Sequence, residues 1–131
     1  MALKLESKIL VIDDMSIMRR MIKKMFVEMG YNNLLESDDG INAWPLIEAA
    51  QKEGSPFDFI VSDWNMPEMS GIDLLIKIRS TPGLEKLPFL MITAETDAEN
   101  LVAAEKAGVS GFIKKPFTID HLKEKMGEMF K

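Results

Sequence analysis

The sequence contains no cysteine and a single histidine, His121. The chain therefore has no disulfide, no thiolate nucleophile and no cysteine zinc site, and one histidine excludes a multi-histidine metal site. No apolar run approaches the roughly 20 residues that a membrane-spanning helix needs. The first residues, Met1–Lys8, carry regularly spaced charges and lack the apolar core of a secretory signal. We therefore expect a cytoplasmic protein with no membrane partner.

An excess of positive charge is also lacking. The formal net charge is −5, whereas proteins that bind nucleic acid through its phosphates present a basic surface. The chain has 131 residues, of which 47% are hydrophobic and 28% are charged, and this is the composition of one ordinary globular domain. We expect no nucleic-acid partner and no second domain.

Five short runs predict strands. The central run, Phe57–Val61, is rich in aromatic and β-branched residues and lies between Pro56 and Pro67, which is typical of a strand buried on both faces. The other four runs are Lys8–Ile12, Leu34–Ser37, Pro88–Thr93 and Gly111–Lys114.

Between these runs and after the last one, apolar residues recur every three or four positions and predict five helices. Ser16 is expected to cap the first helix with its side-chain oxygen, and Asp97 and Thr118 are expected to cap the fourth and fifth. The second helix follows Asp38–Gly40 and contains Pro45. Because proline removes a backbone donor, it should kink or shorten that helix.

Strands that alternate with helices indicate an α/β fold with a parallel sheet, because parallel strands need long crossover connections. Right-handed crossovers leave few topologies. We expect the flavodoxin-like (βα)5 arrangement, with a five-stranded parallel sheet in the order 2-1-3-4-5 and helices on both faces. In such sheets, ligands bind beyond the carboxyl ends of the strands, at the switch point between the first and third strands.

Polar residues stand where four of the five predicted strands end. Asp13 and Asp14 follow the first strand, Asp63 follows the third, Thr93 closes the fourth and Lys115 follows the fifth. The predicted topology brings all of them to one edge of the sheet. Three converging carboxylates repel one another unless a cation joins them, and ligands that are all oxygens favour a hard ion such as Mg²⁺.

The same residues favour phosphoryl chemistry. Mg²⁺, the Lys115 ammonium and the Thr93 hydroxyl would each bind one phosphoryl oxygen. Asp63, on the central strand, is the carboxylate best placed to attack phosphorus and form an acyl phosphate.

Each of these residues alone also has a purely structural explanation. The Asp13–Asp14 pair would stabilise the N-terminus of the first helix, Asp63 would cap a turn, Thr93 would bond to a neighbouring loop and Lys115 would be a solvated lysine. Their joint occurrence at four strand ends favours the functional interpretation. A Mg²⁺-dependent phosphatase acting on external substrates is an alternative, but it would need an acid-base group where the chain has the neutral Asn65.

Four segments resemble the receiver domain of two-component response regulators, and the likeness extends over essentially the whole chain. It is strongest to the single-domain chemotaxis members of that family. The segments are Val11–Asp14, Ile60–Pro67, Met91–Glu95 and Lys114–Phe117. The resemblance implies that residues 1–131 form a single receiver domain without an output domain. It also implies a signalling protein rather than an enzyme, one that is phosphorylated and dephosphorylated only on itself.

The resemblance implies a role for each acidic residue. Asp63 would be the phosphoacceptor and would become 4-aspartylphosphate. Asp14, Asp63 and the backbone carbonyl of Asn65 would bind Mg²⁺, and Asp13 would act through a bound water.

Other residues would hold the phosphoryl group or respond to it. By the resemblance, Asn65 and Ala94 would contact the phosphoryl group, Lys115 would bind it, and Thr93 would be the switch hydroxyl. The bond between Lys115 and Pro116 would be cis.

The resemblance further implies a mechanism and partners. A histidine kinase of the chemotaxis type would phosphorylate Asp63, Thr93 would move toward the new charge, and an aromatic residue of the fifth strand would fill the vacated space. The surface of the fourth helix, fifth strand and fifth helix would then bind the flagellar motor switch protein. A phosphatase is a further candidate partner, the monomer is the expected form, and Asn65 and Glu95 would line the approach of the hydrolytic water.

The sequence departs from the family at Phe112, where chemotaxis members usually carry tyrosine. Phenylalanine can change rotamer, but it has no hydroxyl to bond in the active state. A second function therefore stands beside motor binding, namely a phosphate sink that drains a shared kinase.

Overall fold

The computed structural model describes residues 3–94 and 98–130, in which five strands alternate with five helices. No helix in these two ranges is long and apolar enough to cross a membrane. The strands are β1 (Ile9–Ile12), β2 (Leu34–Ser37), β3 (Phe59–Asp63), β4 (Phe89–Thr93) and β5 (Gly111–Lys114). The helices are α1 (Ser16–Glu28), α2 (Gly40–Lys52), α3 (Gly71–Arg79), α4 (Ala98–Lys106) and α5 (Ile119–Met129).

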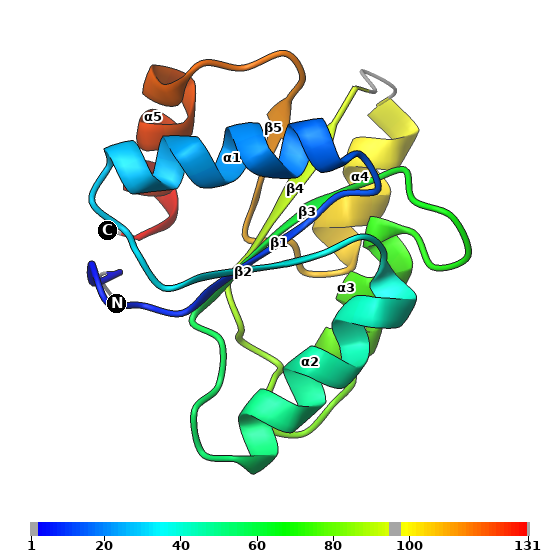
Figure 1. The fold of residues 1–131 in the computed structure, drawn as a ribbon. Coiled ribbons are helices and arrows are strands. Elements are labelled where there is room, and N and C mark those ends of the chain that lie inside the picture. The colour runs from blue at the N-terminus through cyan, green and yellow to red at the C-terminus, as the bar shows by residue number, and fades with distance from the viewer. Residues whose placement is uncertain (1–2, 95–97, 131) are drawn as a thin grey trace.

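The strands form one parallel sheet in the order β2-β1-β3-β4-β5. Helices α1 and α5 cover one face of the sheet, and α2, α3 and α4 cover the other (Figure 1). This confirms the flavodoxin-like α/β fold that the sequence predicts, including the strand order.

Two hydrophobic clusters fill the space between the sheet and its two helical layers. Ile9 and Val11 of β1 belong to the cluster under α1 and α5, whereas Leu10 and Ile12 belong to the cluster under α2 and α3. Successive side chains of a strand point to opposite faces, so a strand covered on both sides is apolar throughout. This explains why every residue of β1 is apolar.

The central strand β3 begins two residues later than the sequence predicts and includes Asp63 as its last residue. Pairing with β1 starts at Phe59. The preceding Asp58 donates its backbone N–H to the Lys8 carbonyl at 2.8 Å, and its carboxylate accepts a hydrogen bond from the backbone N–H of Lys8, also at 2.8 Å. At the other end, Asp63 lies in register with Ile92 of β4, so the sheet itself holds the Asp63 backbone.

The prediction that Ser16 caps the first helix is wrong, because Ser16 is the first helical residue. Met15 occupies the cap position and has no side-chain acceptor. The Asp13 carboxylate accepts a hydrogen bond from the backbone N–H of Met15 at 2.9 Å, and so stabilises this turn from the strand side. Thr118 caps α5 as predicted, and Asp97 lies outside the described residues.

Helix α2 continues through Pro45 to Lys52, so the expected shortening does not occur. Proline removes the backbone hydrogen bond to the carbonyl four residues earlier and crowds that carbonyl, which here belongs to the exposed Ile41 and can be hydrated. The helix is also capped by Asp39, whose carboxylate accepts from the backbone N–H of Asn42 at 2.8 Å.

Arg79, at the end of α3, joins α3 to the loop before β4 and the loop before β5. Its guanidinium donates to the carbonyl oxygens of Leu87 at 2.7 Å and Gly108 at 2.9 Å, and to Ser110 Oγ at 3.4 Å. Burial lowers the pKa of Arg79. All three of these partners are uncharged, so the Arg79 guanidinium acts by donating several hydrogen bonds to neutral acceptors.

We expect Arg79→Met to lower the free energy of unfolding by about 1–3 kcal/mol, because the Leu87 carbonyl beside the core loses its donor. Urea denaturation measures this loss. Arg20→Met is the matched control, since Arg20 is exposed on α1. Equal losses in the two variants would contradict the role of Arg79.

Candidate functional site

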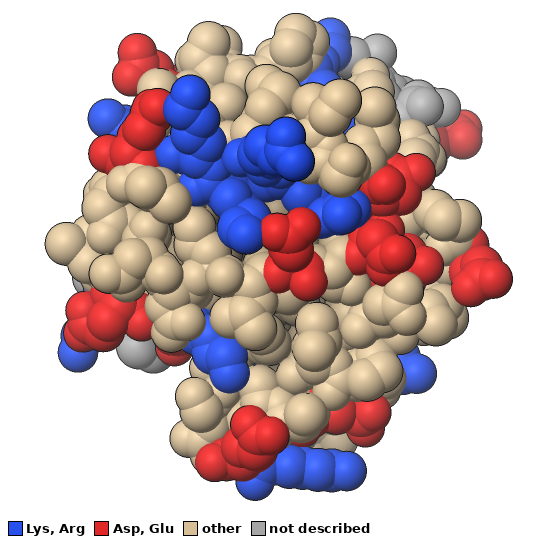
Figure 2. Space-filling view, viewed as in Figure 1, with Lys and Arg blue, Asp and Glu red and all other residues tan. Residues whose placement is uncertain are grey.

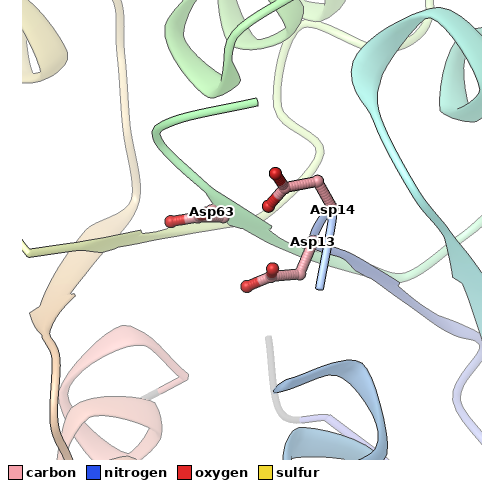
Figure 3. A group of neighbouring side chains, drawn as sticks. All are labelled: Asp13, Asp14 and Asp63. Carbon is pink, nitrogen blue, oxygen red and sulfur yellow. The ribbon is translucent and has the colours of Figure 1, made fainter. Parts of the chain in front are cut away.

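Three carboxylates meet at the C-terminal edge of the sheet. Asp13 and Asp14 follow β1 and Asp63 ends β3, and one oxygen of each lies within 4.8 Å of the others. All three carboxylates point to the same side of the strand ends (Figure 3). Asp13 is fully buried, Asp63 is 5% exposed and Asp14 is exposed. The cluster is thus closed on the protein side and open to solvent at Asp14.

Lys115 reaches the same cluster from the loop after β5. Its Nζ lies 3.1 Å from Oδ1 of Asp63 and 3.5 Å from Oδ2 of Asp13. One ammonium therefore serves two buried carboxylates. Together with Asp14, the cluster keeps an excess of negative charge.

Burial raises the pKa of both Asp13 and Asp63, and the loss of hydration is the largest cause for each. The negative charge of Asp13 raises the pKa of Asp63 further, while Lys115 opposes both shifts. Carboxylates whose charged form is disfavoured in this way are stabilised by a nearby cation. The cluster is therefore electrostatically suited to gain one.

The raised pKa of Asp63 makes the free energy of unfolding depend on pH. Because the pKa of Asp63 is raised in the folded protein, the folded state binds more protons than the unfolded chain between the unfolded value near 3.8 and the folded value. Stability contributed by this group is therefore lost as the pH rises through that range. In metal-free buffer, we expect Asp63→Asn to gain stability relative to the parent as the pH rises, measured by urea denaturation at a series of pH values. A stability difference that does not change with pH would contradict the raised pKa.

The residues predicted to contact the phosphoryl group follow or end strands at the same edge of the sheet as these carboxylates. Thr93 is the last residue of β4 and is 2% exposed, and Ala94 follows it at the surface. Asn65 is exposed and lines a surface pocket together with Asp14 and Trp64. These residues stand at one edge of the sheet, whereas Glu95, which is predicted to line the approach of the hydrolytic water, lies outside the described residues.

The region after β4 also agrees with the resemblance. The bond between Lys115 and Pro116 is cis. Phe112 of β5 is half-buried and lies in register with Met91 of β4. It is therefore on the strand next to the one that ends in Thr93.

Two residues support the site in ways that sequence reasoning did not predict. A Cβ at Gly71 would overlap the carbonyl oxygen of Asp63, so only glycine lets α3 begin this close to the end of β3. Arg19 of α1 donates a hydrogen bond to the Asp13 carbonyl at 2.6 Å. A glycine directly before a predicted helix was a usable signal, whereas the contact of Arg19 depends on how α1 crosses the sheet.

Lysine and arginine side chains gather over α1 (Figure 2). Arg19 and Lys23 of this group pair with Glu36 of β2 at 2.8 and 2.7 Å. Hydrogen bonds from Lys23 and Arg19 lower the pKa of Glu36. These pairs tie α1 to β2 and keep the N-terminus of α1 beside Asp13.

The side chains at this edge fit a hard divalent cation. All three converging ligands are carboxylate oxygens, two of them carry a raised pKa, and the exposed Asp14 leaves a side on which an ion can keep its waters. Mg²⁺ prefers such oxygen ligands and retains several water molecules. The cluster is thus an acidic site of the magnesium-binding type.

A parallel (βα)5 sheet with three carboxylates and a lysine at its C-terminal edge defines a receiver-type signalling domain. In agreement, the family model of the response regulator receiver domain matches residues 9–127. The chain belongs to this family, and it is a signalling protein rather than an enzyme with an external substrate.

Similar proteins include chemotaxis proteins of two bacteria. The chain is 51% identical over 123 residues to the chemotaxis protein CheY-3 of Vibrio cholerae, which covers 94% of this chain and 91% of the relative. It is 46% identical to the chemotaxis protein CheY of Pseudomonas aeruginosa, over 94% of this chain and 95% of that one. By sequence, then, it is a CheY-like receiver domain.

Solved structures support the same family. The chemotaxis response regulator CheY4 of Vibrio cholerae superposes with a TM-score of 0.80 at 29% identity, covering 95% of this chain and 98% of that one. The receiver domain of the histidine kinase CKI1 from Arabidopsis thaliana, solved with Mg²⁺ and BeF3⁻, gives a TM-score of 0.81 at 25% identity, covering 95% and 91%.

Proposed function

We propose that this chain is a phosphorylation-activated switch of bacterial chemotaxis and that Asp63 is its phosphoacceptor. The observation that carries the proposal is the position of the Asp63 carboxylate, 3.1 Å from Lys115 Nζ and within 4.8 Å of the other two acids. Asp63 ends the central strand, so its carboxylate stands at the C-terminal edge of the sheet beside the other two acids.

In the proposed step, an Asp63 oxygen forms a bond to phosphorus while the bond from phosphorus to the donor breaks. The donor is the phosphohistidine of a chemotaxis-type kinase or a small acyl phosphate, and the histidine nitrogen or the acyl oxygen leaves. Lys115, already beside Asp63, binds a phosphoryl oxygen. Asp14, Asp63 and the Asn65 carbonyl would hold Mg²⁺, with Asp13 acting through a water, and the ion would supply positive charge to the phosphoryl oxygens.

Thr93 and Phe112 would transmit the change. Thr93, at the end of β4, would move toward the phosphoryl group, and Phe112 on the neighbouring strand would follow into the space left behind. Contact between the two strands supports this coupling, since Thr93 pairs with Lys114 and Met91 with Phe112. A population shift of this kind would change the surface of α4, β5 and α5.

The names of the relatives support a chemotactic output, in which the activated form binds the flagellar motor switch protein in the cytoplasm. The specific observation that favours the alternative phosphate sink is Phe112, which lacks the hydroxyl of the usual tyrosine. Both functions require phosphorylation of Asp63, and they differ only in the output.

We expect a helical peptide of the motor switch protein to bind at least about ten-fold more tightly to the protein activated with beryllofluoride and Mg²⁺ than to the untreated protein. Isothermal titration calorimetry measures the two affinities. Asp63→Asn is the control, because it removes the carboxylate to which beryllofluoride must bind. Activation without any gain in peptide affinity would favour the phosphate sink.

A further inference from the structure

The ring of Phe112 has a cationic neighbour. Lys125 of α5 places its Nζ 5.8 Å from the centroid of this ring. β5 is the last strand of the sheet, so one of its edges is open. Phe112 packs with the cluster under α2 and α3, whereas α5 covers the opposite face. The Lys125 side chain therefore reaches around the open edge of β5.

Gly111 of β5 lies close against side chains of α5. A Cβ at Gly111 would lie 2.9 Å from Met129 Sδ, so the Met129 side chain would have to shift, and 3.6 Å from Lys125 Cδ, which is an ordinary contact distance. With glycine, the aliphatic part of Lys125 passes close to the strand. Glu128 lies one helical turn further on, and its Oε2 is 3.3 Å from Lys125 Nζ. The ammonium thus has two neighbours, the Glu128 carboxylate and the Phe112 ring.

We propose that Lys125 is a positioning residue that holds Phe112 in its resting position by a cation–π contact. The inference deepens the proposed function, because it requires that Phe112 moves on activation. A phenylalanine ring offers no hydroxyl, but its face attracts a cation that lies within about 6 Å. A contact made only in the resting state lowers the free energy of that state relative to the active state. An activating ligand must then supply this additional free energy from its own binding, so its affinity for the protein falls.

The test is the affinity of the protein for beryllofluoride at saturating Mg²⁺, followed by the fluorescence of Trp64, which directly follows Asp63 in the chain. Lys125→Gln should bind beryllofluoride about two- to five-fold more tightly than the parent, which corresponds to the strength of an exposed cation–π contact. Lys125→Arg should restore the parent affinity, since arginine keeps the cation. Lys123→Gln is the matched control, because Lys123 is an exposed lysine of α5 that is absent from the pocket around Phe112.

A second comparison isolates the ring. In a Phe112→Leu background, Lys125→Gln should leave the beryllofluoride affinity unchanged, because leucine has no aromatic face. The proposal is overturned if Lys125→Gln behaves like the parent or like Lys123→Gln, or if its effect persists without the ring. The Phe112 ring resonances in NMR spectra should shift in Lys125→Gln and not in Lys123→Gln. If the parent protein failed to bind beryllofluoride at all, the proposed function would fail instead.

Discussion

Asp63→Asn should abolish labelling of the protein by radioactive acetyl phosphate in the presence of Mg²⁺. The amide keeps the shape of the side chain but has no anionic oxygen to attack phosphorus. Lys115, whose Nζ lies 3.1 Å from the Asp63 carboxylate, and the neighbouring acids would remain in place. The loss of label would therefore reflect the loss of one oxygen nucleophile.

The folding of this variant can be checked independently. The buried Asp63 carboxylate carries a raised pKa, so an uncharged amide should leave the protein folded and at least as stable near neutral pH. Asp120→Asn is the matched control, because Asp120 is an exposed acid of α5. Label that persists in a folded Asp63→Asn protein would place the acceptor on another residue.

Asp14→Asn should raise the dissociation constant for Mg²⁺ by at least about ten-fold, which is about 1.4 kcal/mol of binding free energy. Asp14 is the exposed member of the cluster and adds the third carboxylate oxygen within 4.8 Å. The substitution replaces an anionic oxygen by a neutral amide oxygen, which attracts the hard Mg²⁺ ion less strongly. Calorimetric titration of the metal-free protein with Mg²⁺ measures the change.

The control for Asp14→Asn is Glu53→Gln, which removes the same charge from an exposed residue just after α2. A loss of Mg²⁺ affinity in Asp14→Asn alone would assign Asp14 as a ligand. If the two variants lost the same small amount, only the net charge of the protein would matter. An unchanged dissociation constant in Asp14→Asn would remove the acidic pair from the metal site.

Much of the fold was predictable because its signals are local. Alternation of apolar runs with helical periodicity identifies five strand–helix units, and the handedness of crossovers then leaves few sheet orders. The prediction of caps succeeded at Thr118, where the side chain bonds within its own turn. It failed at Ser16, because the carboxylate that supports the start of α1 belongs to Asp13, outside the helix.

The site was predictable for a different reason. Parallel strands all end at one edge, so polar residues that end strands must gather there whatever their separation in sequence. This reasoning places Asp13, Asp63, Thr93 and Lys115 together without any knowledge of distances. It does not identify Arg79 or Arg19, because each of these contacts depends on where a helix lies on the sheet.

From its sequence alone, this protein is a single run of alternating strands and helices with three acids, a hydroxyl and a lysine at the strand ends. The tertiary structure decides what those groups experience: Asp13 and Lys115, 102 positions apart, come within 3.5 Å, and burial raises the pKa of Asp13 and Asp63. It also decides that Lys125 reaches the ring of Phe112 around an open strand edge. The physical reason is that spacing along the chain sets secondary structure, whereas dehydration and charge proximity arise only when distant segments pack together.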